Sequence, residues 1–121
     1  MIKKLSTDNL IEIVERYDTS NKIYEKDTDI SEYSKQSGKY TVEYIKEEIN
    51  EGGICVQRNR TQYRKDNSTK EINETFSDKG KLQNRVTQEE ILAQRIVRTR
   101  VEEFDKDGKK TKDERTVEPI K

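Results

Sequence analysis

The apolar positions in the first part of the chain follow a helical spacing. Those separated by three or four residues are Leu10, Ile13, Val14 and Tyr17. This spacing places them on one helix face, and Thr7 or Asp8 can cap its amino end. We therefore predict a helix that begins near residue 8. The next segment, about 18–38, is polar and its apolar residues are irregularly spaced, which favours a loop with at most a short strand near Ile23.

A second helix is predicted from about Thr41 to Asn50. Its apolar residues, Val42, Ile45 and Ile49, share a helical face. Gly52 and Gly53 follow, as glycines commonly do where helices end. A strand over 40–46 remains the alternative, because tyrosines alternate with Val42 there.

After the two glycines, the period of the pattern changes to two. Residues 54–61 alternate as a strand does, and Asp66–Ser68 has the composition of a turn. Residues 70–76 can return as a second strand, and residues 81–86 form a third strand after a turn at 77–80. This part of the chain is predicted to be an antiparallel meander.

Thr87–Glu90 has the pattern of a helix capping box and precedes the apolar residues 91–93. A helix is therefore predicted to begin there. An apolar stripe would continue it to Phe104, whereas the β-branched residues between 96 and 101 favour a strand. We favour a short helix followed by a hairpin over about 95–118. The Gly–Lys pairs at 80–81 and 108–109 are too short a similarity to establish a repeat.

These elements predict one α+β domain over residues 1–121, with two or three helices packed with a short antiparallel sheet of hairpins. Only 25 of the 121 residues are Leu, Ile, Val or Phe, and 41% are charged. The 25 basic and 25 acidic residues cancel, which removes the self-repulsion that keeps charged chains unfolded. We expect a folded domain with a thin core, for which a partner or a homo-oligomer would supply further burial.

The composition also argues against enzyme classes. The chain has no His and one Cys, so histidine-based triads, histidine zinc sites and thiolate cages are excluded. No phosphate-loop pattern occurs. Cys55 lies in a strand pattern and is interpreted as an inert thiol, and the many acidic residues as a solvated face. We predict no enzyme activity, no metal and no cofactor.

The compartment is predicted from what the sequence lacks. The longest apolar run is three residues, and Met1–Ser6 is too polar for a signal peptide. We expect a cytoplasmic protein without membrane contact. The abundance of Lys, Ile, Asn and Glu suggests an AT-rich coding sequence, as in a phage or another mobile element.

Two groups of basic residues are candidate nucleic-acid-binding residues. The first is Arg58, Arg60 and Arg64 with Tyr63, and the second is Arg95, Arg98 and Arg100. If the two strands were neighbours, they would form an arginine-rich sheet face that binds phosphates, with Tyr63 stacking on a base. The alternative is that these arginines pair with glutamates across strands, which the net neutrality favours.

Tyrosines form the candidate protein interface, since tyrosine is enriched where proteins meet. The residues are Tyr24, Tyr33, Tyr40 and Tyr44. The alternative is that they complete the thin core. The leading hypothesis is a small cytosolic binder, adaptor or inhibitor of another protein. The alternative is a nucleic-acid-binding protein that uses an arginine-rich sheet face.

Overall fold

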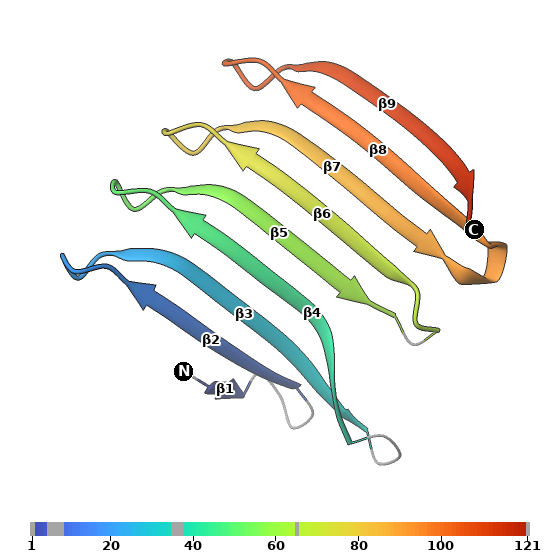
Figure 1. The fold of residues 1–121 in the computed structure, drawn as a ribbon, viewed down its shortest axis with the longest axis horizontal. Coiled ribbons are helices and arrows are strands. Elements are labelled where there is room, and N and C mark those ends of the chain that lie inside the picture. The colour runs from blue at the N-terminus through green and yellow to red at the C-terminus, as the bar shows by residue number, and fades with distance from the viewer. Residues whose placement is uncertain (1, 5–8, 35–37, 65, 121) are drawn as a thin grey trace.

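The computed structural model describes residues 2–4, 9–34, 38–64 and 66–120, which form one antiparallel sheet. Its strands follow one another in chain order, each paired with the next (Figure 1). The nine strands are β1 (Ile2–Lys4), β2 (Asn9–Tyr17), β3 (Ile23–Ser34), β4 (Gly38–Ile49), β5 (Cys55–Tyr63), β6 (Thr69–Phe76), β7 (Leu82–Ile91), β8 (Ile96–Phe104) and β9 (Lys110–Pro119). The short β1 and the long β9 are the two edges of this open sheet.

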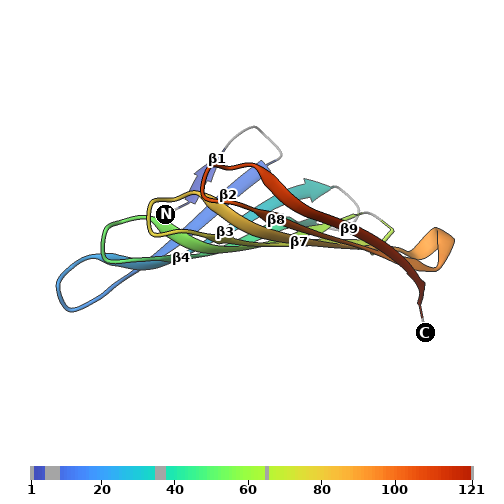
Figure 2. The same ribbon diagram turned by 90° about the horizontal axis from the view of Figure 1, so that it is seen from above.

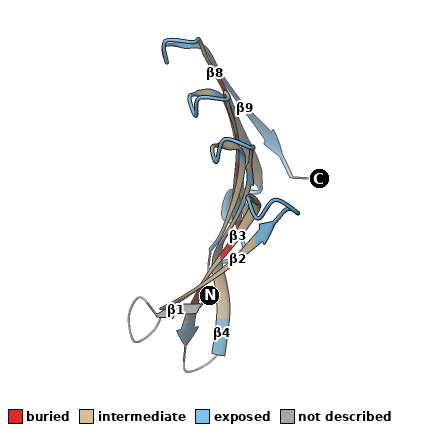
Figure 3. Ribbon diagram, turned by 90° about the vertical axis from the view of Figure 1, so that its left-hand side faces the viewer, coloured by how far each residue is buried: buried red, intermediate tan, exposed pale blue. Residues whose placement is uncertain are grey.

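The sheet is a single layer that no other element covers in the part of the chain described. Figure 2 shows it as one twisted band, and Figure 3 shows its curvature seen from the side. Among the described residues, Ile72 is the one buried apolar residue, at 7% exposure. The buried polar residues are Thr28, Ser31, Ser68, Glu74 and Glu102. Both faces of the sheet therefore contact solvent. The described part of the chain buries less apolar surface than a two-layer fold would.

The α+β prediction is wrong, because both long helices predicted in the first half are strands. The helix expected from near residue 8 is β2, and the Thr7 and Asp8 caps lie outside the described residues. Ile11 and Ile13 pair with residues of β3 on one face, while Leu10 and Val14 lie on the other. A sheet wet on both faces carries apolar residues on both, so their combined spacing imitates a helical stripe.

The other helix predictions are also wrong. Residues 41–49 belong to β4, as in the strand alternative, and Asn50, Gly52 and Gly53 lie in the hairpin turn that follows. The capping-box residues 87–90 continue β7, where Thr87 pairs with Ile72 and Arg100. The sole helical element among the described residues is a three-residue 3₁₀ turn, Leu92–Gln94. The predicted loop at 18–38 holds the 12-residue strand β3.

Five of the described hairpin turns share one backbone geometry, in contrast to the 3₁₀ turn between β7 and β8. In each, the first residue donates to the fifth carbonyl, and the fourth residue, at positive φ, donates to the first carbonyl. The five turns are 18–22, 50–54, 64–68, 77–81 and 105–109. In four of them the first side chain, Asp18, Asn50, Ser77 or Asp105, also accepts from the amides of the third and fifth residues. Local turn chemistry thus fixes each hairpin without a core.

The positive φ gives a prediction for the β8–β9 turn. Gly108 has φ +83°, and a Cβ built there would meet no atom within 4 Å, so Gly108→Ala tests backbone strain alone. We expect a loss of roughly 1 to 2 kcal/mol in the free energy of unfolding. Urea denaturation followed by circular dichroism measures it. Gly52→Ala is the control, since Gly52 is not among the positive-φ residues. Equal effects of the two substitutions would contradict the turn geometry.

Candidate functional site

A row of charged side chains crosses one face of the sheet from strand to strand. Cross-strand pairing aligns Glu15, Lys26, Glu47, Arg58, Glu74, Arg85, Glu102 and Asp113. The sign of the charge alternates from Glu15 to Glu102. We call this face, which also carries Ile72, the arginine face, and the other the opposite face. Like charges directly across strands destabilise a sheet, whereas opposite charges stabilise it, so this row favours the observed register.

The two buried carboxylates of the row are each held by several cations. Glu74 accepts from Arg58 at 2.9 Å and lies 3.6 Å from Arg85. Glu102 is 2% exposed and is 3.0 Å from Arg85 and 2.8 Å from Lys110. Buried charges need such partners, because a carboxylate left unpaired away from water is costly. These ion pairs therefore satisfy the buried acids and also hold the arginine side chains in place.

Aromatic rings extend this arrangement toward the hairpin turns. The guanidinium of Arg58 lies 5.3 Å from the ring centre of Phe76, and that of Arg85 lies 5.8 Å from the ring centre of Phe104. The Lys110 ammonium lies 5.9 Å from the same Phe104 ring. These cation–π contacts cover ring faces that would otherwise meet solvent.

Two acids of the row, Glu102 and Asp113, have a lowered pKa because of the cations that they contact. The side-chain hydrogen bond from Arg85 is the largest influence on Glu102 and, with Lys110, lowers its pKa to about 2 despite burial, which acts in the opposite direction. Arg100, hydrogen-bonded at 2.9 Å and 3.0 Å, likewise holds the pKa of Asp113 far below its usual value. Both groups are therefore carboxylates at neutral pH.

Beside the charge row, away from these turns, lies a cleft of about 640 Å³ with an excess of positive charge. Ile72, Thr87 and Val117 also line it, and its acids are Glu89 and Glu102. The six basic residues of its lining are Arg60, Lys70, Arg85, Arg98, Arg100 and Arg115. We call it the basic cleft.

Several cations of the basic cleft are not neutralised within the chain. Lys70 and Arg98 form no ion pair with another described residue, and Arg98 is exposed. The buried Nε of Arg60 has no hydrogen-bond partner among the described residues. In contrast, Arg85 and Arg100 are bound to Glu102 and Asp113. Because Arg60 also lies 3.5 Å from Glu74, Lys70 and Arg98 are the groups with capacity left for a ligand.

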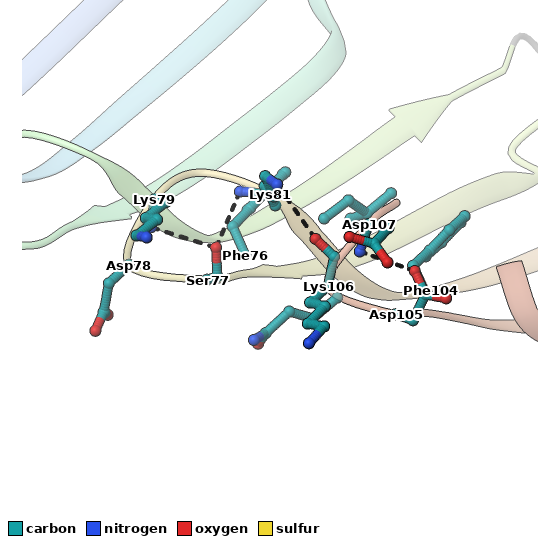
Figure 4. Close-up of a pocket in the computed structure, with 11 residues that line it drawn as sticks. Phe76, Ser77, Asp78, Lys79, Lys81, Phe104, Asp105, Lys106 and Asp107 are labelled. Atoms are coloured by element: carbon teal, nitrogen blue, oxygen red, sulfur yellow. Dashed lines mark hydrogen bonds between the residues drawn. The ribbon is translucent and has the colours of Figure 1, made fainter. Parts of the chain in front are cut away.

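A second hollow, of about 620 Å³, lies where the β6–β7 and β8–β9 turns stand side by side. Phe76, Leu82 and Phe104 are its apolar residues (Figure 4). Lys81 of the first turn donates to the carbonyl oxygen of Lys106 in the second at 3.2 Å. Further lining residues are Ser77, Asp78, Lys79, Gln83, Asp105 and Asp107. We call it the turn cleft.

The predicted arginines lie mostly on one face, although the two strands that bear them are not neighbours. β6 and β7 separate β5 from β8. The register pairs Arg58 and Arg60 with Glu74 and Ile72, and it pairs Arg98 and Arg100 with Glu89 and Thr87. All of these side chains lie on the arginine face. Arg64, next to β5, reaches Glu89 on that face. Intrachain pairing with glutamates thus occupies much of the arginine-rich face.

Two residues of the nucleic-acid prediction lie elsewhere. Tyr63 pairs with Thr69 and alternates onto the opposite face, where it is 45% exposed. Arg95 ends the 3₁₀ turn with φ 56° and is exposed beyond the strand. Neither is positioned to act with the arginines of the basic cleft.

The four interface tyrosines do not form one patch. The Tyr40 hydroxyl donates to Glu32 at 2.8 Å on the arginine face, whereas Tyr44 pairs with Thr61 on the opposite face. Tyr24 and Tyr33 are 45% and 48% exposed. Tyr33 shares the opposite face with Tyr44 but lies near the end of β3.

Sequence reasoning missed five residues of the site: Lys70, Glu74, Arg85, Glu102 and Arg115. A period-two pattern over residues 82–91 would have placed Arg85 with Thr87 and Glu89, had the capping box not been preferred. The charge distribution gives another signal. Residues 1–54 hold eight basic and twelve acidic residues, whereas residues 55–121 hold seventeen and thirteen. The basic cleft lies in this positive half.

No family model, curated protein or solved structure was found to match the chain. In the described ranges, no three acidic or cysteine side chains are arranged to hold a metal ion, and no helix is long and apolar enough to span a membrane. Cys55 is half-buried, and burial raises the pKa of its thiol. The basic residues that line the basic cleft make the arginine face the candidate site.

Glu102 gives a pH-dependent prediction. Because its pKa falls from 4.5 to about 2 on folding, its carboxylate stabilises the protein above pH 4.5, and this stabilisation is lost as the pH falls toward 2. Glu102→Gln should therefore lower the free energy of unfolding by about 2 kcal/mol at pH 7 and by less at pH 2.5. Urea melts at both pH values measure this. Glu103→Gln, exposed on the other side of the same strand, should change little, and a pH-independent loss for Glu102→Gln would refute the assignment.

Proposed function

We propose that the protein is a binding module that captures an acidic segment of a partner protein in the basic cleft. The observation that carries this proposal is the charge of the cleft, whose lining has six basic and two acidic residues. Lys70 and Arg98 remain without an ion-pair partner among the described residues. Carboxylates of a partner would accept charge-assisted hydrogen bonds from both of these cations.

The single-layer architecture supports the same proposal. Ile72 and Thr87 form part of the cleft, and Val117 at its rim is 61% exposed. A partner laid on this face would cover apolar surface and arginine stems that nothing else in the described chain covers. Burial at the interface would add to the small burial within the chain.

Nucleic acid is the competing ligand, because unpaired arginines also bind phosphates. Three features favour a protein partner instead. Tyr63, the candidate stacking residue, lies on the opposite face, and Phe76 and Phe104 line the turn cleft rather than the basic cleft. Single-strand binding normally needs aromatic platforms next to the cations. The overall net charge of zero also differs from that of most nucleic-acid-binding domains.

The test uses a fluorescein-labelled peptide of alternating Glu and Ser and measures its anisotropy with the purified protein at low and near-physiological salt. Arg98→Glu reverses an unpaired cation and should weaken binding by about tenfold, since it replaces attraction by repulsion. Lys112→Glu is the matched control, because it changes the net charge equally from the opposite face of β9. Equal effects of both substitutions, or no binding of the peptide at low salt, would overturn the proposal.

The same titration with labelled 20-nucleotide single- and double-stranded DNA separates the two ligand classes. We expect the peptide to bind more tightly than either DNA at matched salt. Tighter DNA binding, weakening steeply with salt and lost in Arg98→Glu, would assign the cleft to phosphates and refute the protein-segment proposal.

A further inference from the structure

We propose that the partner segment is extended and bipartite, with an apolar anchor residue in the turn cleft and acidic residues in the basic cleft. This inference rests on the proposed function and specifies its ligand. It arises because the arginine face carries two hollows of different chemistry on the same strands. The basic cleft accounts for the acidic residues of the ligand. A ligand with acidic residues alone would leave the turn cleft empty.

The turn cleft has the chemistry of an anchor site. Its apolar residues Phe76, Leu82 and Phe104 are half-buried. The hydrogen bond from Lys81 to the Lys106 carbonyl ties its two walls together, and each wall is one of the shared hairpin turns (Figure 4). A hollow with an apolar floor and pre-formed walls suits a single large apolar side chain, because neither wall must reorganise on binding. Three lysines and three aspartates also line the cleft, so its lining carries no net charge.

The position of the two clefts fixes the spacing within the ligand. On β8, Phe104 belongs to the turn cleft, and Arg100 and Arg98 belong to the basic cleft. At ~3.3 Å per residue, these arginines lie roughly 13 Å and roughly 20 Å along the strand from Phe104. An extended peptide that runs along β8 therefore reaches the basic cleft about four to six positions from the anchor, and its acidic residue at the sixth position meets Arg98, which forms no ion pair with another described residue.

The end of the basic cleft next to the turn cleft does not compete for either part of the ligand. Arg85 and Glu102, which line that end, neutralise each other at 3.0 Å. A ligand residue over this pair meets no unpaired charge. The linking residues are therefore free to be polar, and the affinity comes from the two ends.

The experiment compares three labelled peptides on the wild-type protein by fluorescence anisotropy. The first carries one Leu with three Glu at positions four to six from it. The second replaces that Leu by Ser, and the third keeps the Leu but moves the Glu residues next to it. We expect the first to bind about tenfold more tightly than the other two, because only it reaches both clefts. These comparisons leave the protein unchanged, so its folding cannot affect them.

A variant of the turn cleft links the anchor to its site. Leu82→Ser should lower the affinity for the first peptide to that of the second and leave the affinity for the second unchanged. Gln83→Ser, whose side chain also lines the cleft but is polar, is the control. Thermal unfolding checks that both variants are folded.

The outcomes separate this inference from the proposed function. If all three peptides bind equally and Arg98→Glu weakens each, acidic capture stands and the bipartite ligand is refuted. If the Leu peptide binds better but Leu82→Ser does not remove the difference, the anchor site is refuted. If no peptide binds at low salt, the proposed function itself fails, and the inference fails with it.

Discussion

Cross-strand pairing between buried acids and arginines is the constraint on which the arginine face depends. Glu74 and Glu102 are buried in a layer whose one buried apolar residue, among those described, is Ile72, and each is held by cations from neighbouring strands. Removing either acid would leave guanidinium groups facing one another across strands. The pairing therefore sets the register between β5 and β8, and the register places every other side chain of that face.

The hairpin turns supply local stabilisation that the charge row does not provide. A single layer buries little apolar surface, so its hairpins need local chemistry that favours reversal in the absence of packing. An acceptor at the first turn position and a residue at positive φ at the fourth supply it at 18–22, 50–54, 77–81 and 105–109. Among the described elements, contacts run almost entirely between strands that follow one another in the chain. Each strand therefore depends mainly on its neighbours, as each unit does in repeat proteins. The Gly–Lys pairs that looked too short to establish a repeat belong to this shared turn.

The sequence predicted the middle strands well, because residues 54–86 alternate clearly and are separated by strong turn residues. The first half was misread for a physical reason. Helix assignment assumes one buried face, whereas β2 and β4 carry apolar side chains on both faces. The capping box at Thr87–Glu90 failed similarly, since Thr87 and Glu89 instead pair across the sheet with Arg100 and Arg98. The arginine face was anticipated from Arg58, Arg60, Arg98 and Arg100, but the acids between them could not be located without the register.

The same pairing that stabilises the face also decides which cations are left for a ligand. The charge of an arginine that is bound to a buried carboxylate, such as Arg85, is neutralised within the chain. Arg98 and Lys70 both lie two rows from the charge row on the same face, form no ion pair with Glu74 or Glu102, and face Glu89, whose carboxylate already contacts Arg64. The unpaired charge thus gathers at one end of the strands, next to a neutral band and opposite the turn cleft. A surface so divided favours a ligand whose own charge is confined to one end, rather than a uniformly charged polymer such as nucleic acid.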